Sequence, residues 1–355
     1  MSGYPVLTGV YEKRSDRRID QKSKIIIFEK AFQKNDLICC KNEIAHLISK
    51  CNLNNNKIEL INMYENRRLG LAYISPYIIG LLVFTAFPFL SSLIISFTDY
   101  DLINPPEYIG LENYRYMMDD DTFYKSMGVT FAYVFLTIPL KLAFALFIAF
   151  VLNFKLRGIK FFRTAYYIPS ILGSSVAIAV LWRAIFSLDG LLNSFLGIFG
   201  VEPISWLGEP VFAMFSVTLL RVWQFGSAMV IFLAALQSVP QSQYEAAMID
   251  GASKWQMFTK ITVPLITPVI FFNFIMQTTQ AFQEFTAPYV ITGGGPAKST
   301  YLFSLYIYET AFKYFDLGYG SALAWVLFVA VAIFTAISFK SSKYWVFYSG
   351  DKGGK

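Results

Sequence analysis

Four polar side chains recur along one apolar stretch late in the chain, residues 264–286. Spacings of four, three and four residues place them on one face of a helix: Asn273, Gln277, Gln280 and Glu284. Amides can hydrogen-bond the hydroxyls of a sugar, and nearby aromatic faces can stack on its ring. Polar groups within an apolar span are costly, so this stripe is a candidate hydrophilic path. The alternative for each residue is interhelical hydrogen bonding without a ligand.

A second cluster of polar and aromatic side chains lies in another apolar stretch, residues 211–235, and consists of Arg221, Trp223 and Gln224. Arg221 could bind an anionic group, which would favour an acidic saccharide or a sugar phosphate as cargo. It could instead pair with Glu284 or reach toward the interface. Lys141, beside Pro139, could face a partner subunit or a wet cavity.

Residue patterns for catalysis or metal binding are not found in the sequence. The single histidine, His46, has no His-x-x-x-His companion, and Cys39, Cys40 and Cys51 lack paired Cys-x-x-Cys spacing. Residues 293–300 superficially resemble a phosphate loop, but non-glycine residues stand where the motif requires glycine. We expect no catalytic site, no metal site and no cofactor bound by this chain.

The composition indicates that these side chains are positioned by membrane helices. Of 355 residues, 55% are hydrophobic and 15% are charged, whereas charged residues make up about 25% of an ordinary soluble domain. Six stretches are long and apolar enough to cross a bilayer. We expect an all-α integral membrane protein with about six transmembrane helices, near residues 70–97, 127–152, 166–186, 211–235, 264–286 and 318–338.

The distribution of positive charge predicts the orientation. With the N-terminus inside, the cytoplasmic segments carry 23 Lys and Arg residues and the outer loops carry 4. Basic residues are retained on the cytoplasmic side, so both termini should be cytoplasmic. This topology accounts for the net charge of +6 without nucleic acid as a partner.

The chain divides by composition into three parts. Residues 1–66 hold all three cysteines and many charges, and they predict a soluble cytoplasmic extension that is partly helical, with apolar residues at helical spacing over 44–51. This extension could be a tether or could dock a partner. Residues 67–345 form the six-span domain and 346–355 a cytoplasmic tail. The first 20 residues lack the apolar core of a cleavable signal, so we expect the first span to direct insertion.

The loop at 238–263, between the fourth and fifth spans, has the features of a cytoplasmic docking surface. Its sequence predicts a short helix, a turn at Gly251, and a second helix that enters the membrane near Pro264. Small side chains at Ala246 and Ala247 would let a partner approach closely, and Glu245 offers a charged anchor.

The order Glu245, Ala246, Ala247, three residues, then Gly251 resembles the signature loop of binding-protein-dependent ABC importer permeases. In that family the loop forms a coupling helix that sits in a cleft of a cytoplasmic ATPase. The resemblance implies a type I importer permease architecture. It also implies ATPase-coupling roles for Glu245, Ala246, Ala247, Asp250 and Gly251.

Other segments are similar to the branch that includes maltose and multiple-sugar importers. They lie at residues 72–77, 87–88, 96–98, 109–114, 190–193, 206–207, 291–296 and 299–300. The resemblance therefore covers most of residues 70–340. The first 66 residues depart from the shared pattern, which leaves their role open.

The resemblance implies several partners in a bacterial cytoplasmic membrane. These are a second homologous permease, two ATPase subunits that bind ATP and magnesium, and an extracellular solute-binding protein that delivers a sugar. Import by alternating access follows from the same resemblance. An ion-coupled sugar carrier is the more remote alternative, but such carriers usually have internal repeats and intramembrane acids. Here Glu284 is the clear acid within a span, and no repeat is visible.

Overall fold

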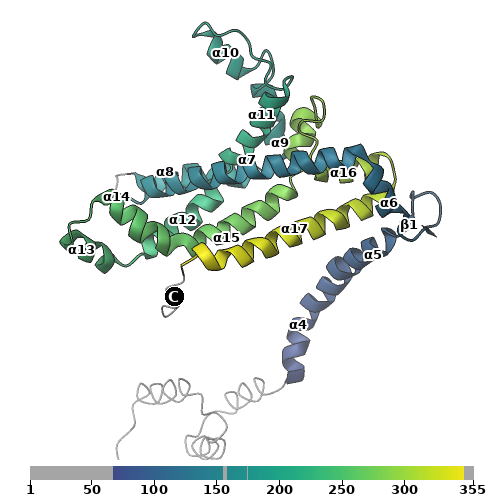
Figure 1. Cartoon of the computed structure of the whole chain (residues 1–355), viewed down its shortest axis with the longest axis horizontal. Coiled ribbons are helices and arrows are strands. Elements are labelled where there is room, and N and C mark those ends of the chain that lie inside the picture. The colour runs from purple at the N-terminus through teal and green to yellow at the C-terminus, as the bar shows by residue number, and fades with distance from the viewer. Residues whose placement is uncertain (1–66, 155–157, 174, 348–355) are drawn as a thin grey trace, which may run out of the picture. The chain divides into compact units, whose positions relative to one another are not determined.

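The computed structural model describes residues 67–347 apart from 155–157 and 174 (Figure 1). The predicted extension at 1–66, with its helix over 44–51, lies outside the described residues, as does the tail from 348 onward. The chain divides into two units, and the boundary in the sequence falls between Phe84 and Thr85. The described part of the first unit is α4 (Arg67–Leu81) and the start of the π-helical turn η1 (Leu82–Ala86).

The second unit begins with elements that lead into its longest helix. Helix α5 (Phe87–Ile95) is followed by a two-stranded antiparallel ribbon, β1 (Thr98–Asp99) and β2 (Glu107–Tyr108), and by α6 (Glu112–Asp119). Helix α7 then runs over Asp121–Leu152. The carboxylate of Asp120 accepts a hydrogen bond from the Thr122 amide at 2.7 Å and so caps α7.

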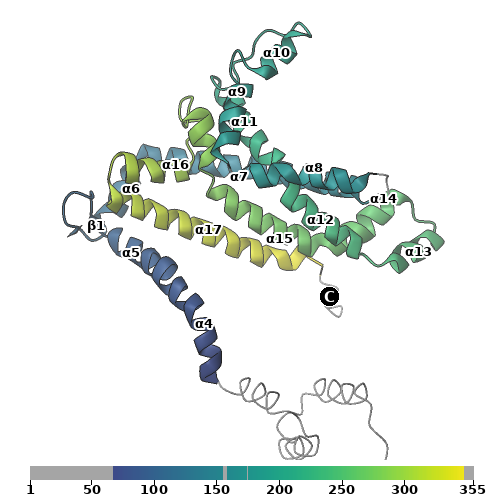
Figure 2. The ribbon, with the colours of Figure 1, turned by 180° about the vertical axis from the view of Figure 1, so that it is seen from behind.

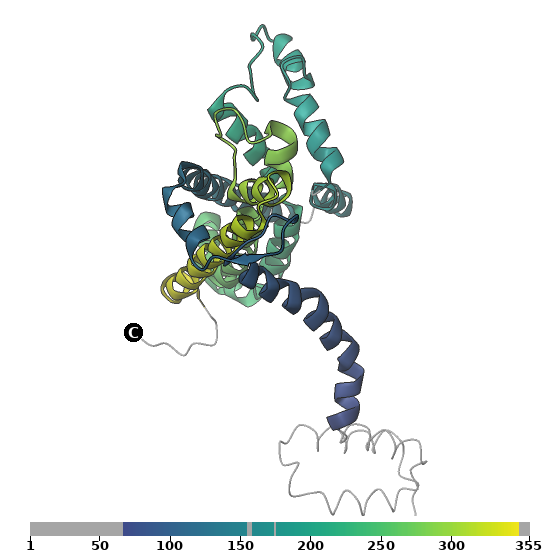
Figure 3. The ribbon, with the colours of Figure 1, turned by 90° about the vertical axis from the view of Figure 1, so that its right-hand side faces the viewer.

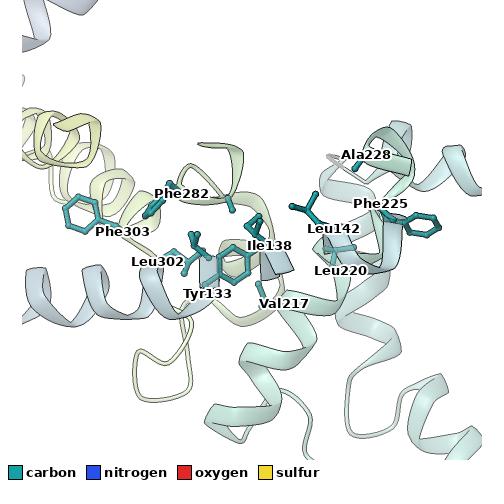
Figure 4. Packing of buried hydrophobic residues seen from close by; sticks show 14 of the residues in the cluster. Tyr133, Ile138, Leu142, Val217, Leu220, Phe225, Ala228, Phe282, Leu302 and Phe303 are labelled. Carbon is teal, nitrogen blue, oxygen red and sulfur yellow. The ribbon is translucent and has the colours of Figure 1, made fainter. Parts of the chain in front are cut away.

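The core forms where α7 packs against later helices. Helices α7, α15 (Val263–Phe282) and α17 (Leu317–Trp345) run alongside one another, and Figure 3 looks toward their ends (Figures 1, 2 and 3). Buried side chains from these and neighbouring helices form one cluster that includes Tyr133, Ile138 and Phe282 (Figure 4). The buried face of α7 also carries the polar residues Thr130, Thr137 and Lys141, so this helix brings polar groups into the bundle.

Two of the predicted spans are not continuous helices. The third consists of α8 (Ile159–Leu172) and α9 (Val176–Ile185), which lie 101° apart, and the fourth of α11 (Pro210–Trp223) and α12 (Gly226–Ser238), which lie 46° apart. Apolar composition predicts the length of a span but not a bend within it, so the sequence did not predict either break. The second break falls at Gln224, whose backbone leaves the helical region with ψ 37°.

The backbones of the two broken spans approach each other closely. A Cβ on Gly226 would lie 2.5 Å from the carbonyl oxygen of Tyr166, so glycine is required there. The Ser170 hydroxyl accepts a hydrogen bond from the Ser227 amide at 2.9 Å and donates one to the Gln224 carbonyl at 3.1 Å. Backbone groups freed by the break are thereby satisfied within the protein, as a membrane interior demands.

Among the described residues, four helices are long and apolar enough to cross a membrane, and up to six if each bent pair counts as one span. This confirms the expected all-α, multi-pass membrane protein. Helix α14 (Lys254–Met257) and the π-helical turn η2 (Phe258–Thr262) continue into α15 as one of these spans, Lys254–Phe282. The remaining elements connect the spans: α10 (Leu191–Gly197), α13 (Gln241–Ile249), η3 (Pro288–Thr292), α16 (Phe303–Tyr308) and η4 (Glu309–Lys313).

Candidate functional site

A cavity of about 320 Å³ lies beside the two helix breaks and the end of α15. Its wall combines charged groups, amides and an aromatic ring, contributed mainly by Arg221, Gln224, Gln280, Gln283, Glu284 and Phe285. Four of these belong to the two clusters expected from the sequence. The fold therefore brings together residues from two separate apolar stretches.

The guanidinium of Arg221 organises the polar side of this cavity. Its Nη1 donates to Gln224 Oε1 at 3.0 Å, and its Nη2 donates to Gln280 Oε1 at 2.9 Å. Glu284 Oε2 lies 3.6 Å from Nη1, so the pairing of these two charges, one of the alternatives for Arg221, is present. Within the part of the chain that the structure describes, the buried Nε of Arg221 has no hydrogen-bond acceptor.

Gln224 connects the cavity to both helix breaks. Its Nε2 donates to the Gly173 carbonyl at 2.7 Å, while its Oε1 accepts from Arg221. The two glutamine ends therefore have different partners, one at the α8–α9 break and one in the cavity. Trp223 is not part of the cavity wall, and its ring centroid lies 5.7 Å from that of Trp182.

The polar stripe on α15 is divided between two environments. Gln280 and Glu284 line the cavity, but Asn273 and Gln277 are buried. Gln277 Oε1 accepts a hydrogen bond from Lys141 Nζ on α7 at 2.6 Å, and Lys141 is only 2% exposed. Asn273 donates to the Val269 carbonyl at 3.2 Å. These two amides therefore make interhelical or intrahelical contacts at positions away from the cavity.

The loop with the signature motif forms a short helix, a glycine turn and a second helix. Helix α13 carries Glu245 and Ala246 on its exposed surface, and Ala247 is partly buried. Gly251 has φ +77°, a conformation that favours glycine, and the Ala252 amide closes the turn on the Ala247 carbonyl at 2.9 Å. Asp250 lies at the C-terminal end of the helix.

Apolar side chains flank this turn, and the motif did not predict them. Ile249 is 87% exposed and Trp255 is 72% exposed, and Met248, which precedes Ile249 in α13, is also exposed. The Tyr244 hydroxyl and Thr262 Oγ1 lie 2.7 Å apart and join α13 to η2. The loop thus presents apolar groups on a braced scaffold, as a protein-binding surface does.

The sequence also did not predict a cluster of one carboxylate and two tyrosines at the N-terminal end of α7. Asp120 accepts hydrogen bonds from the hydroxyls of Tyr306 and Tyr319, the latter at 2.9 Å. Burial acts to raise the pKa of Asp120, but these hydrogen bonds and those from the α7 backbone together lower it. The sequence signal was an acidic residue directly before a long apolar stretch, which is typical of a helix cap.

The described residues contain no group of three or more His, Cys, Asp or Glu side chains that could hold a metal ion.

Comparison with known proteins identifies the class. Residues 121–342 match the family of binding-protein-dependent transport system inner membrane components. A multi-pass helical fold, a polar cavity beside broken spans and an exposed loop with the family's signature accompany that match. The chain belongs to this family and is an ABC transporter permease located in the inner membrane.

Relatives cover most of the chain. The probable ABC transporter permease protein YesP of Bacillus subtilis is 50% identical over 80% of this chain and 93% of its own. The trehalose/maltose transport system permease protein MalF of Thermococcus litoralis is 35% identical over 79% of this chain and 96% of its own. A permease from the crystal structure of a bacterial alginate ABC transporter, in complex with an alginate pentasaccharide-bound periplasmic protein, shares the fold. Its TM-score is 0.70 at 21% identity, over 79% of this chain and 96% of that one.

Proposed function

We propose that the chain is the permease subunit of an ATP-driven importer of sugars or oligosaccharides. Membership of the binding-protein-dependent family supports the transporter class. Relatives named as trehalose/maltose, lactose and multiple sugar permeases support the cargo class. The cavity beside the broken spans would be the part of the path that this subunit contributes.

The observation that carries this proposal is the polar wall of the cavity inside an apolar bundle. Gln280, Gln283 and Gln224 supply amide groups, and Phe285 supplies a ring face. The guanidinium of Arg221 donates to Gln224 and Gln280 at 3.0 and 2.9 Å and so orients both amides at the wall. Amides and hydroxyls together with an apolar face are what a pyranose ring requires from its site.

The charge balance of the wall favours a neutral saccharide. Arg221 and Glu284 lie 3.6 Å apart and together contribute no net charge. An acidic saccharide or sugar phosphate is the second candidate, supported by the guanidinium of Arg221 in the cavity wall. For an acidic group, Glu284 would add repulsion close to the guanidinium.

The rest of the assembly follows from the same proposal. A second homologous permease would complete the path, two cytoplasmic ATPases would bind ATP and magnesium, and an extracellular binding protein would deliver the cargo. Each bent pair would count as one of six spans, with both termini in the cytoplasm of a bacterium. The turn at Glu245–Gly251, with exposed Ile249 and Trp255, would dock on an ATPase and carry its closure to the spans.

Substitution in the cavity tests the path directly. Gln280→Leu removes the amide that accepts from Arg221, and we expect saccharide uptake by the complete transporter to fall roughly tenfold. Gln237→Leu is a matched control on the exposed surface of α12 and should leave uptake unchanged. Equal uptake by the two variants, at equal membrane levels, would remove the cavity from the path.

A further inference from the structure

Four aromatic rings form a continuous row next to the cavity, and we call Phe285, Tyr289, Tyr308 and Phe312 the aromatic row. Phe285 and Tyr289 are stacked, with centroids 5.0 Å apart and planes 18° apart. Tyr308 lies 4.7 Å from Phe285 and 5.4 Å from Tyr289. Phe312 extends the row at 5.5 Å from Tyr308. The turn after α15 and the elements η3, α16 and η4 each contribute one ring to this arrangement.

The row connects the cavity to the protein surface. Phe285 forms part of the cavity wall and is partly buried, whereas Tyr289 is 45% exposed and Phe312 is 62% exposed. Tyr308 is also partly buried, so the exposed rings of the row are Tyr289 and Phe312.

The inner end of the row is fixed by contacts with the cavity residue Glu284. Its Oε1 accepts a hydrogen bond from the Ala287 amide at 3.2 Å, and the Ser304 hydroxyl donates to its carbonyl oxygen. Phe285, the next residue, is thus held between an anchored residue and the start of η3. Glu284, a charged residue of the cavity, and Phe285, the first ring of the row, are therefore adjacent in the chain and are held by the same contacts.

Polar groups lie along the outer part of the row. Glu309 follows Tyr308 and pairs with Lys313 at 2.8 Å, and the Tyr301 hydroxyl donates to Glu309 at 2.6 Å. The hydrogen bonds from Lys313 and Tyr301 lower the pKa of Glu309 although burial acts to raise it, so this carboxylate is ionised at neutral pH. Carboxylate, ammonium and phenol groups beside ring faces can hydrogen-bond hydroxyls while the rings contact C–H groups.

We propose that the aromatic row is a track for pyranose rings, which takes a saccharide from the outer surface toward the cavity. The inference rests on the proposed function. A sugar ring has an apolar face of C–H groups and an equatorial edge of hydroxyls. Successive aromatic faces can hold such a ring in several neighbouring positions at similar free energy, so it can advance without a deep trap. The track therefore suits chains of pyranoses better than a single small ion.

An aromatic belt at the membrane interface is the alternative role for exposed tyrosine and phenylalanine. Interface anchors are spread around the lipid-facing circumference of a bundle. The rings here instead pack on one another and end at a polar cavity. This continuity favours the saccharide over lipid headgroups.

Magnetic resonance on the complete transporter in lipid nanodiscs can test the track. Saturating aromatic protons should transfer signal to the ring protons of a bound sugar, with maltotriose and trigalacturonate as the two probes. The double variant Tyr289→Ala and Phe312→Ala should lower the transferred signal and raise the KM for uptake by about 2- to 10-fold. Tyr314→Ala removes an exposed aromatic that does not stack in the row, and it should change neither quantity.

Each outcome of this experiment bears on the track. Loss of signal and a higher KM in the double variant alone would support it. Three results would overturn the track. The double variant and the Tyr314→Ala control could give equal signals, neither probe could receive signal from aromatic protons, or the double variant could lose membrane stability with an unchanged KM. The last result would assign the rings to the lipid interface. Failure of the proposed function gives a different result, because the unaltered transporter would then take up neither probe.

Discussion

The side-chain amide of Gln224 donates a 2.7 Å hydrogen bond to the backbone carbonyl of Gly173. Gln224 stands at the break between α11 and α12, and Gly173 at the C-terminal end of α8. The other end of the same side chain accepts from Arg221 in the cavity. One residue therefore contacts both bent spans and the cavity, so a change of bend would alter the cavity wall.

The contact between Gln224 and Gly173 should require that residue 173 has no side chain. A Cβ there would lie 2.3 Å from Gln224 Cγ, so Gly173→Ala should displace the glutamine and destabilise the protein by about 1–3 kcal/mol. Gly128→Ala is the control, because a Cβ at Gly128 meets nothing within 4 Å. We expect thermal unfolding in detergent to show a lower midpoint for Gly173→Ala alone, together with reduced uptake. Identical unfolding midpoints for Gly173→Ala and Gly128→Ala would show that the break does not require glycine at position 173.

Gln277 should act as the partner of a buried lysine. Replacing it with leucine leaves the side-chain nitrogen of Lys141 without its 2.6 Å acceptor in the bundle core, which should cost roughly 1–3 kcal/mol. Lys141→Met combined with Gln277→Leu removes both groups and should recover most of that loss. A double-mutant cycle on unfolding free energies measures the coupling. Additive losses would show that the contact contributes little.

Acid should weaken the cluster around Asp120. Its pKa in the folded protein is below the ordinary value of 3.8, so its stabilising effect is present above about pH 4 and is lost as the pH falls through the folded pKa. Asp120→Asn should therefore lower stability by about 1 kcal/mol at pH 7, with the difference shrinking in acid. The exposed Asp119→Asn serves as the control. A difference that stays constant from pH 7 to pH 3 would contradict this assignment.

The turn after α13 should be needed for coupling and dispensable for insertion. Gly251→Ala forces a non-glycine residue to φ +77°, at a cost of about 1 kcal/mol, and Glu245→Lys reverses an exposed charge. Both should uncouple ATP hydrolysis from uptake in the assembled transporter. Gln243→Lys adds charge to the same exposed helix and should remain coupled. Normal uptake per ATP in both loop variants would exclude a coupling role.

The sequence predicted the helical membrane fold because each span is a long apolar segment, a local property. It also identified two polar clusters, since polar residues are conspicuous in such segments. Arg221 and Gln224 of one cluster and Gln280 and Glu284 of the other line the cavity, whereas Trp223, Asn273 and Gln277 do not. The sequence placed Gln277 on the same face as Gln280, which is correct for an ideal helix. Gln277 contacts Lys141 on α7, whereas Gln280 lines the cavity beside the break at Gln224. This difference depends on residues outside α15, so the sequence of α15 does not show it.

The bends were not predicted because they rest on contacts between distant segments. Ser170 and Gly226 lie 56 positions apart, and hydropathy alone does not show that they meet. The Asp120 cluster and the aromatic row also combine residues from separate elements.

The central claim is that this permease acts in an ATP-driven importer of saccharides. The most direct measurement is ATP hydrolysis by the complex that copurifies with the tagged chain, reconstituted in lipid and challenged with neutral and acidic oligosaccharides on their binding protein. The account predicts recovery of a second permease and an ATPase, with hydrolysis stimulated by one saccharide class. A lone chain whose uptake stops only when an ion gradient is collapsed would contradict it.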